Sequence, residues 1–480
     1  MEWTPCEPST KAGTRRRAGT KYSITMGNLQ YGKPPLGAYD LTYLSVPSMF
    51  STLGSEKHSR RKRMMTHVYS KSYIFSSAAA RAQSKAILLE RLLPLLRREA
   101  MKSDSRGSEV QSIFMATSMD LISSYIFGLK NSTDFLQDKT YRSHWLQLYL
   151  SRHHHHFWPQ ELPLLTSVCG KLGYRLYPPF VDSANEEIRQ WNKNMCDSAR
   201  SMLKNEREVW SRLVDQPVVF KALHEGFDKE ERVKGEGSLL HNASIKQRDI
   251  AVASEILDQV LAGHETAGIV LTYIAWRLSQ SPDLQAQLRE ELLSIKASLQ
   301  IEDDAYSELP DAKELDSLPV LNAVVKETLR LHAPIPGPQP RTTPYPFCQI
   351  DGYTIPGGVR IASLAHTLHL DDRVFSGARC WDPSRWLVQE SGGEGDDADD
   401  ADERRKKMNR QFWAFGSGGR MCVGSNFALT GIKNVVAVIY ANFKTEIVND
   451  DGMEQTDGYS SRPKCDELHL KFVPLWNVAR

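Results

Sequence analysis

One cysteine stands in a glycine-rich loop, in the sequence from Phe415 to Gly424 that reads FGSGGRMCVG. Its glycines allow a tight turn and a close approach of the backbone to a flat ligand. Peptide N–H groups in such a turn can point at the sulfur and stabilise its negative charge. The segment from Cys422 to Phe443 has helical character, and a helix N-terminus favours a thiolate. A thiolate held in this way can be the single axial ligand of a haem iron, an arrangement that favours O–O cleavage.

The complete pattern F-x-x-G-x-R-x-C-x-G is formed by Phe415, Gly418, Arg420, Cys422 and Gly424. A lone cysteine beside a glycine loop would more often be a buried free thiol. The complete pattern, however, resembles the signature of the cytochrome P-450 family of haem-thiolate monooxygenases. This resemblance implies haem b (iron protoporphyrin IX) as the cofactor. Cys422 would then ligate the iron, Phe415 would cover the sulfur, and Arg420 would reach an acidic side chain of the porphyrin.

Upstream, Glu327 and Arg330 are three residues apart and would share a face of a helix. Such a pair alone usually marks a solvated helix face. It resembles the E-x-x-R motif of the family, whose third partner would be Arg385 in the segment Trp381–Trp386. The resemblance implies a structural charge cluster that supports the cysteine loop, and a buried cluster of this kind is costly to break.

A long helical pattern runs from about Ser244 to Leu278, and the segment Ala262–Thr266 reads AGHET. A mid-helix glycine with an exposed acid would be the ordinary interpretation, at a cost of roughly 1 kcal/mol relative to alanine. The segment resembles the oxygen-activation motif of the family. We therefore expect a local opening of the helix over the haem, where Thr266 steadies oxygen and Glu265 helps deliver protons.

Three further basic residues occur in the same sequence order as residues that bind the haem propionates in the family. His58 and Lys62 are four residues apart in a basic helical segment, with lysine in place of the commoner arginine. A solvated basic face that meets an acidic partner is an alternative for this segment. Arg341, at the start of a strand region, resembles another position that binds a haem propionate.

The composition limits the class of protein. The chain has 480 residues, a net charge of +2, and 60 basic against 58 acidic side chains, so nothing favours a nucleic acid as partner. The seven cysteines are scattered without C-x-x-C spacing, which favours free thiols in a reducing compartment. An internal run of four histidines, 153–156, fits a solvated helix end better than a metal site.

The resemblance implies a mainly α fold with a smaller β part. The haem would lie between the long oxygen-activation helix and the helix that follows the cysteine loop. Residues 58–480 would form the haem domain, and residues 1–57 an N-terminal remnant without the roughly 20 apolar residues of a membrane anchor. The region 391–407 has clustered acidic and basic residues, and we expect it to be an exposed, mobile insertion.

Elsewhere the pattern predicts several shorter elements. Helices are expected within 74–128, over 184–210 with a polar linker from there to about 242, and over 284–299 and 321–331. The region 135–180 should roof the substrate. Strands are expected within 349–365 and 468–473.

The resemblance is closest to filamentous-fungal members of the microsomal type, many of which modify secondary metabolites. It implies insertion of one oxygen atom from O2 into a small lipophilic substrate. Electrons would come from NADPH through a separate cytochrome P-450 reductase, or partly through cytochrome b5. An intracellular place at the endoplasmic reticulum surface follows from the same resemblance. Alternatives are a member that rearranges, couples or desaturates its substrate, or a truncated haem-binding remnant without turnover.

Overall fold

The computed structural model describes residues 46–102, 105–152, 155, 157–204, 212–295, 308–387 and 396–476. Helices make up most of these residues, and three small antiparallel sheets accompany them. The predicted class, mainly α with a smaller β part, is confirmed. Of the predicted N-terminal remnant, residues 1–57, the first 45 lie outside the described residues.

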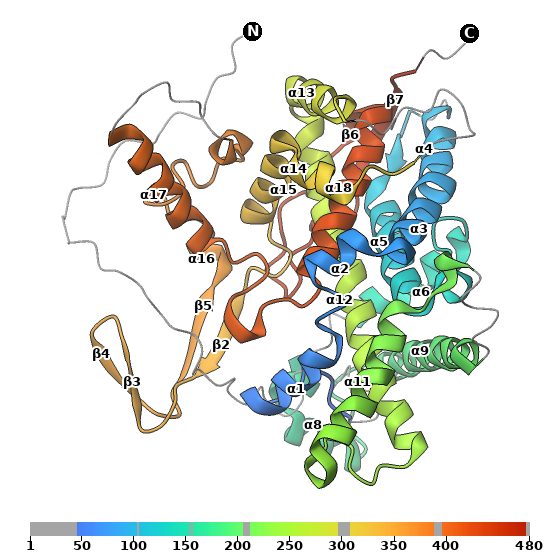
Figure 1. Ribbon diagram of the computed structural model, residues 1–480, viewed down its shortest axis with the longest axis vertical. Coiled ribbons are helices and arrows are strands. Elements are labelled where there is room, and N and C mark those ends of the chain that lie inside the picture. Colours follow the sequence, from blue (N-terminus) through green and yellow to red (C-terminus); the bar gives the residue numbers. More distant parts are fainter. Residues whose placement is uncertain are drawn as a thin grey trace.

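The helices that frame the site and the surfaces discussed below are distributed along the whole described chain (Figure 1). They are α1 (Ser55–Met65), α2 (Lys71–Ser76), α3 (Ala78–Ile87), α4 (Leu93–Ala100), α5 (Val110–Phe127), α6 (Lys139–Ser151), α7 (Phe157–Glu161), α8 (Pro163–Lys171), α9 (Phe180–Lys204), α11 (Val218–Lys234), α12 (Ile245–Ser279), α13 (Pro282–Leu293), α14 (Ala312–Ser317), α15 (Pro319–Leu331), α16 (Ala365–His369), α17 (Asp396–Gln411) and α18 (Ser425–Asn442).

Helix α12 runs through the middle of the molecule and packs against α5 (Figure 1). It starts with the capping box that its sequence predicts, formed by Ser244 and Gln247. Gly263 lets the two helices approach closely, because a Cβ added there would lie 2.7 Å from Cγ1 of Ile122. The expected local opening at this glycine is wrong. The helix is α-helical throughout Ile245–Ser279, since the glycine serves helix packing instead.

The strands form three separate antiparallel sheets. The largest has the order β1-β7-β6, with β1 at Ser108–Glu109, β6 at Phe443–Asn449 and β7 at His469–Pro474. Strands β2 (Pro338–Thr342) and β5 (Arg360–Leu364) pair next to the site, with Arg341 opposite Ile361. Strands β3 (Phe347–Ile350) and β4 (Tyr353–Pro356) form a hairpin that projects from the body (Figure 1). The predicted strands within 349–365 and 468–473 are confirmed.

The predicted polar linker after residue 210 is wrong for much of its length, because α11 occupies Val218–Lys234. Its apolar residues recur with helical spacing and are buried: Val218, Val219, Phe220, Ala222, Leu223 and Phe227. They pack on α1, α5 and neighbouring helices, so burial of this stripe stabilises a helix in an otherwise polar segment.

Within the region 391–407, predicted to be an exposed, mobile insertion, residues 396–407 belong to helix α17. Residues 402–407 are exposed, as predicted. Residues 391–395 lie outside the described chain. The sequence places acidic residues at the N-terminal half of α17 and basic ones at its C-terminal half, which complements the helix dipole. Asp402 and Lys406 form an i,i+4 ion pair at 2.6 Å. Met408 is buried against Phe375 and Ala378, which anchors the helix to the body.

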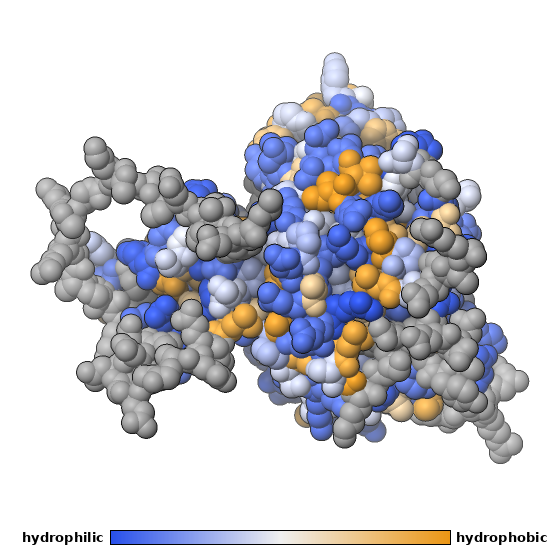
Figure 2. All heavy atoms as spheres, turned by 90° about the horizontal axis from the view of Figure 1, so that it is seen from above, coloured by the Kyte–Doolittle hydropathy of each residue, from blue (hydrophilic) through white to orange (hydrophobic). Residues whose placement is uncertain are grey.

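The outer surface is mostly polar on the face shown in Figure 2, where apolar side chains form small separate patches. None of the described helices combines the length and the apolar character that crossing a bilayer requires.

Candidate functional site

Cys422 lies between a short 3₁₀ turn, Gly418–Arg420, and the first residue of α18. Gly416 and Gly418 have φ of 72° and 70°, values that side-chain-bearing residues rarely adopt. The loop closes through a hydrogen bond of 2.9 Å from the Cys422 N–H to the Phe415 carbonyl. Phe415 itself is half-buried and packs against the core. The turn thus presents the sulfur at the entrance of α18.

The surroundings of the Cys422 sulfur suit a thiolate ligand. The residue is solvent-accessible but lies deep in the molecule, and desolvation raises the pKa of its thiol. The backbone N–H groups of Gly424 and Ser425 donate to the sulfur, and the Lys62 ammonium is near, so all three oppose that rise in pKa. These are the hydrogen bonds and charge that tune a metal-bound sulfur. A bound cation would shift the balance fully to the thiolate.

Four basic side chains from three different elements converge beside this loop. His58 and Lys62 come from α1, Arg341 from β2, and Arg420 from the turn before Cys422. Burial, followed by the charges of Arg420, Lys62 and Arg341, lowers the pKa of His58 to about 4. The histidine is therefore neutral at pH 7, and three cations surround it. The Lys62 ammonium donates to the carbonyls of Gly419 at 3.1 Å and Met421 at 2.7 Å.

This arrangement fits haem b. The Cys422 sulfur would hold the iron, and the cationic cluster would hold the two carboxylate groups of the porphyrin, because gathered positive charges are stabilised by anions. Lys62 bonds to the cysteine loop itself, so it also couples α1 to the position of the sulfur. Among the described residues no group of three or more His, Cys, Asp or Glu side chains could hold a metal ion. Of the histidine run 153–156, the structure describes only His155.

Glu327, Arg330 and Arg385 form a buried charge cluster on α15 and the turn that contains Arg385. Arg330 Nη2 donates to Glu327 Oε1 at 2.7 Å, and Arg385 Nε donates to the same oxygen at 3.0 Å. The indole N–H of Trp386 donates to Glu327 Oε2 at 2.9 Å. Arg330 also donates to the carbonyls of His369 and Ala378, at 2.7 and 2.6 Å. Glu327 and Arg330 have fully buried side chains, so their charges are stabilised by these partners together with the Asp382 backbone N–H, which donates to Glu327, and the Cys380 carbonyl, which accepts from Arg330.

His369 connects this cluster to the cysteine loop, and the sequence did not single it out. Its Nδ1 lies 2.8 Å from the Arg330 carbonyl, and its Nε2 accepts the Trp413 backbone N–H at 2.8 Å. Burial lowers its pKa to about 4, which keeps the ring neutral with one donor and one acceptor nitrogen. Trp413 in turn accepts from the Gly416 N–H at 2.9 Å. No local pattern marks His369, because both its partners are distant in the sequence.

On α12, Glu265 and Thr266 point to different surroundings. Glu265 is buried and accepts from the Tyr149 hydroxyl at 2.7 Å and the Ser460 hydroxyl at 2.8 Å. Arg462 lies 3.8 Å from the same carboxylate. Thr266 is half-buried, and its hydroxyl donates to the Ala262 carbonyl at 2.9 Å. Glu265 therefore ties α6 and the 460–462 segment to α12, which the sequence alone did not indicate.

Tyr69 places α12 close to the cysteine. Its hydroxyl donates to Gln259 Oε1 on α12 at 2.7 Å. Burial and then the charge on Cys422 raise the pKa of its phenol. Its carbonyl accepts from Asn426 in the first turn of α18, at 3.0 Å. One buried residue thus connects the helix that carries Thr266 to the helix that follows Cys422.

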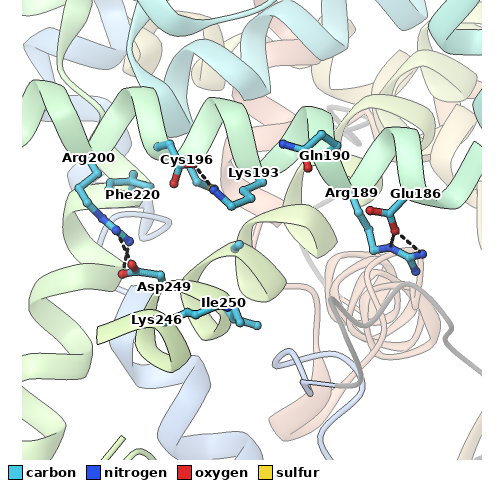
Figure 3. A pocket seen from close by; sticks show the side chains of 12 residues that line it. Glu186, Arg189, Gln190, Lys193, Cys196, Arg200, Phe220, Lys246, Asp249 and Ile250 are labelled. Carbon is cyan, nitrogen blue, oxygen red and sulfur yellow. Dashed lines mark hydrogen bonds and ion pairs between the residues drawn. The ribbon is translucent and has the colours of Figure 1, made fainter. Parts of the chain in front are cut away.

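A separate pocket of about 470 Å³ lies between α9, α11 and α12 (Figure 3). Its floor includes the buried Cys196 and Phe220. Its charged lining is largely neutralised by three ion pairs, which are Glu186–Arg189, Lys193–Asp197 and Arg200–Asp249. None of the predicted site residues lines it.

Comparison with known proteins gives a consistent result. A family model described as Cytochrome P450 matches residues 40–464. The chain is 26% identical over 397 residues to "Cytochrome P450 monooxygenase avaI" of Aspergillus versicolor, covering 81% of this chain and 82% of that protein. It is 25% identical over 431 residues to "Cytochrome P450 monooxygenase ankB" of Aspergillus thermomutatus, covering 89% and 72%. It is also 25% identical over 424 residues to "Fusicoccadiene C-8 hydroxylase" of Alternaria brassicicola, covering 86% and 71%.

Proposed function

The chain belongs to the cytochrome P450 family, a family of haem-thiolate enzymes, and from this premise we propose that it inserts one atom of O2 into a small organic substrate. The other oxygen atom leaves as water, and NADPH supplies the two electrons through a separate reductase. The observation that carries the proposal is the convergence of the Cys422 loop with three cations and a neutral histidine. In this proposal, residues 58–480 form the haem domain.

The residues of the chain have separate proposed roles. When bound, haem b supplies the reductive activation of O2. Cys422 would hold its iron through a sulfur that two N–H groups stabilise, and Arg420, Arg341, His58 and Lys62 would hold its carboxylates. Glu327, Arg330 and Arg385 keep the supporting segment in place.

Thr266 and Glu265 are the proposed oxygen-binding and proton-delivery pair. The Thr266 hydroxyl, on the half-open side of α12, can hold and pass a proton at Oγ1. Glu265 is fixed one residue earlier by two hydroxyl groups that can exchange protons with its carboxylate. Buried hydroxyl–carboxylate chains of this kind can carry protons into a site without admitting bulk water.

For the substrate class we propose a lipophilic secondary metabolite, because the similar fungal proteins include one named for hydroxylation of fusicoccadiene. For the electron donor, residues 404–407 of α17 are basic and exposed, and Arg405 lies near the half-buried Lys326. Burial and then the charges of Lys433 and Arg405 lower the pKa of Lys326. This basic surface would suit an acidic flavoprotein reductase or cytochrome b5.

We also propose contact with the endoplasmic reticulum surface through α7, α8 and the turn that follows. This apolar patch consists of exposed side chains, which are Phe157, Leu162, Leu164, Leu165, Val168, Leu172 and Tyr174. Clustered exposed apolar side chains mark interaction sites, and a lipid surface removes them from water without requiring a spanning helix.

The carbon monoxide difference spectrum of the reduced protein tests the proposal, with a Cys422→Ala variant beside it. We expect a strongly red-shifted Soret band in the wild type and its loss in the variant. Incubation with NADPH, reductase and ¹⁸O2 then separates oxygenation from rearrangement or desaturation, because only oxygenation leaves label in the product. A folded haem form without substrate-dependent NADPH consumption would contradict the monooxygenase proposal.

A further inference from the structure

A narrow strip of α12 stays open between buried flanks. Asp258, Ala262 and Thr266 follow one another at intervals of four residues, so they share one side of the helix. Ala262 is exposed and the other two are half-buried, whereas residues 251–257 and 268–275 are buried. Asp258 therefore lies on the same open strip as the proposed oxygen-binding hydroxyl, two helical turns before it.

In the described part of the chain, the groups that donate hydrogen bonds to the Asp258 carboxylate are neutral. It accepts hydrogen bonds from the Ser48 hydroxyl and from the Phe50 backbone N–H. Burial and the neighbouring charge of Glu255 raise the pKa of Asp258 to about 7. None of the groups that shift this pKa is a cation. Among the residues that the structure describes, no cation acts on this carboxylate, so its ionised form is partly desolvated in an unfavourable state.

Glu255, one turn earlier on α12, differs from Asp258 in having a cationic partner. It is buried, receives the Arg61 guanidinium at 2.6 Å and accepts the Met49 backbone N–H at 2.7 Å. Arg61 therefore neutralises Glu255 and leaves one net negative charge in this group of three ionisable side chains. Segment 46–53, which covers them, contributes no titratable side chain of its own. Above its pKa of about 7, Asp258 therefore carries the excess negative charge of these three side chains, beside the open strip.

We infer that Asp258 is a specificity-determining residue that binds a cationic nitrogen group of the substrate, an ammonium or a guanidinium. The inference rests on the proposed monooxygenase function and specifies its substrate class. A substrate cation at this position would give the carboxylate a charge partner that none of the described side chains near it provides. Its Ser48 and Phe50 bonds would fix the direction in which the carboxylate receives the cation.

The position also constrains which part of the substrate reacts. Eight residues of α-helix separate Asp258 from Thr266, a rise of about 12 Å. A substrate anchored at Asp258 would therefore be oxidised at an atom far from its cationic group. The apolar Ala262, between the two, would face the middle of the substrate.

An alternative role for Asp258 is purely structural, as the anchor of segment 46–53 on α12. The structural role needs only a hydrogen-bond acceptor at this position, whereas the binding role needs a negative charge. Asp258→Asn keeps an acceptor for Ser48 and Phe50 but removes the charge, and Asp258→Glu keeps the charge. A structural anchor would therefore tolerate asparagine, whereas a cation site would not.

The test uses the haem-loaded protein, first accepted by its carbon monoxide spectrum, so that failure of the proposed function is recognised separately. The probes are 4-phenylbutyl-trimethylammonium and its neutral carbon isostere with a tert-butyl group. The quaternary nitrogen cannot ligate iron, and the two probes differ only in charge. Binding is followed by the Soret shift and by calorimetry.

At pH 8 we expect the wild type to prefer the cationic probe by about tenfold, and Asp258→Asn to lose that preference while still binding the isostere. Asp258→Glu should keep part of the preference. The preference should shrink at pH 6, where Asp258 is protonated. Equal binding of the two probes by the wild type, or an unchanged preference in Asp258→Asn, would overturn the inference. If Asp258→Asn fails to load haem, the inference is tested by the probe preference of Asp258→Glu and by the change of the wild-type preference between pH 8 and pH 6. A wild-type preference that does not change with pH would then overturn it.

Discussion

At the scale of single residues, the site depends on groups whose ionisation the fold controls. His58 and His369 both have a pKa near 4, because burial disfavours the imidazolium form. The neutral His58 ring lies among the cations of the basic cluster. The neutral His369 ring connects Arg330 of the charge cluster to Trp413 beside the cysteine loop through hydrogen bonds. Their protonation would therefore disturb the proposed haem-anchoring cluster and the hydrogen bonds that support the cysteine loop.

A loss of stability at acidic pH follows from these two histidines. Unfolded histidine has a pKa of 6.5, so the unfolded chain binds more protons than the folded one between pH 6.5 and 4. The free energy of unfolding should fall as pH decreases through that window, by at most about 3 kcal/mol for each histidine. Chemical denaturation from pH 7.5 to 4.5 measures this. A His369→Gln variant with an unchanged slope would contradict the assignment to His369.

His369→Phe tests the link to the cysteine loop directly. The substitution keeps the ring volume but leaves the Trp413 N–H without its acceptor. We expect a loss of about 1–3 kcal/mol in stability, because a buried donor remains unsatisfied. We also expect faster haem release, measured by transfer to apomyoglobin. His366→Phe on the same helix is the control, and an equal effect there would argue against a specific role for His369.

Glu327→Gln tests the charge cluster. It removes the charge shared by Arg330 and Arg385 while both remain buried, so we expect a loss of about 3–5 kcal/mol. The matched control is Asp197→Asn, which breaks an exposed ion pair with Lys193 and should cost less than about 1 kcal/mol. Urea denaturation compares them. Similar losses of stability in the two variants would show that burial does not increase the cost of removing a charge from the cluster.

At the scale of elements, close packing of α12 against α5 sets the position of the open strip. Gly263→Ala would place a Cβ 2.7 Å from Ile122 Cγ1, so the helices must separate slightly. We expect a destabilisation of about 1–3 kcal/mol and a shifted Soret band. In a double-mutant cycle, Ile122→Ala should offset part of the Gly263→Ala cost. Strictly additive losses would show that the two residues do not contact as described.

Also at this scale, two segments are helical where their sequence favoured polar, irregular chain. Helix α11 is stabilised by an apolar stripe that contacts several other helices, and α17 by charge order and by Met408. In both cases the decisive energy comes from contacts with distant residues or from the position of charges along a helix. The many charged residues of these two segments therefore did not prevent them from forming helices.

At the scale of the whole molecule, helix α8, which carries part of the exposed apolar patch, and helix α13 lie at opposite ends (Figure 1). If the patch contacts lipid, Leu164→Glu with Val168→Glu should reduce cosedimentation with phosphatidylcholine–phosphatidylserine vesicles by several fold, because charge opposes insertion of apolar surface. Leu293→Glu on α13 is the control. The carbon monoxide spectrum should be unchanged in both. Unchanged vesicle binding of the double variant would exclude this patch as the membrane surface.

The sequence alone determined the chemistry proposed near Cys422, because the proposed iron ligand, its glycines and Arg420 are neighbours in the chain. It also determined the long helix Ile245–Ser279 with its capping box, since periodicity and capping are local properties. The pairing of Glu327 with Arg330 follows from helical spacing in the same way. These features need only a few residues close in sequence to specify them.

Only the tertiary structure decided how distant side chains meet. It brought His58, Lys62 and Arg341 beside Arg420, and it inserted His369 between Arg330 and Trp413. It gave the neighbouring Glu255 and Asp258 different surroundings, because Arg61 pairs with Glu255, whereas the described groups that donate to Asp258 are neutral. The physical reason is that burial and charge compensation depend on which elements pack together, and no local spacing encodes that packing.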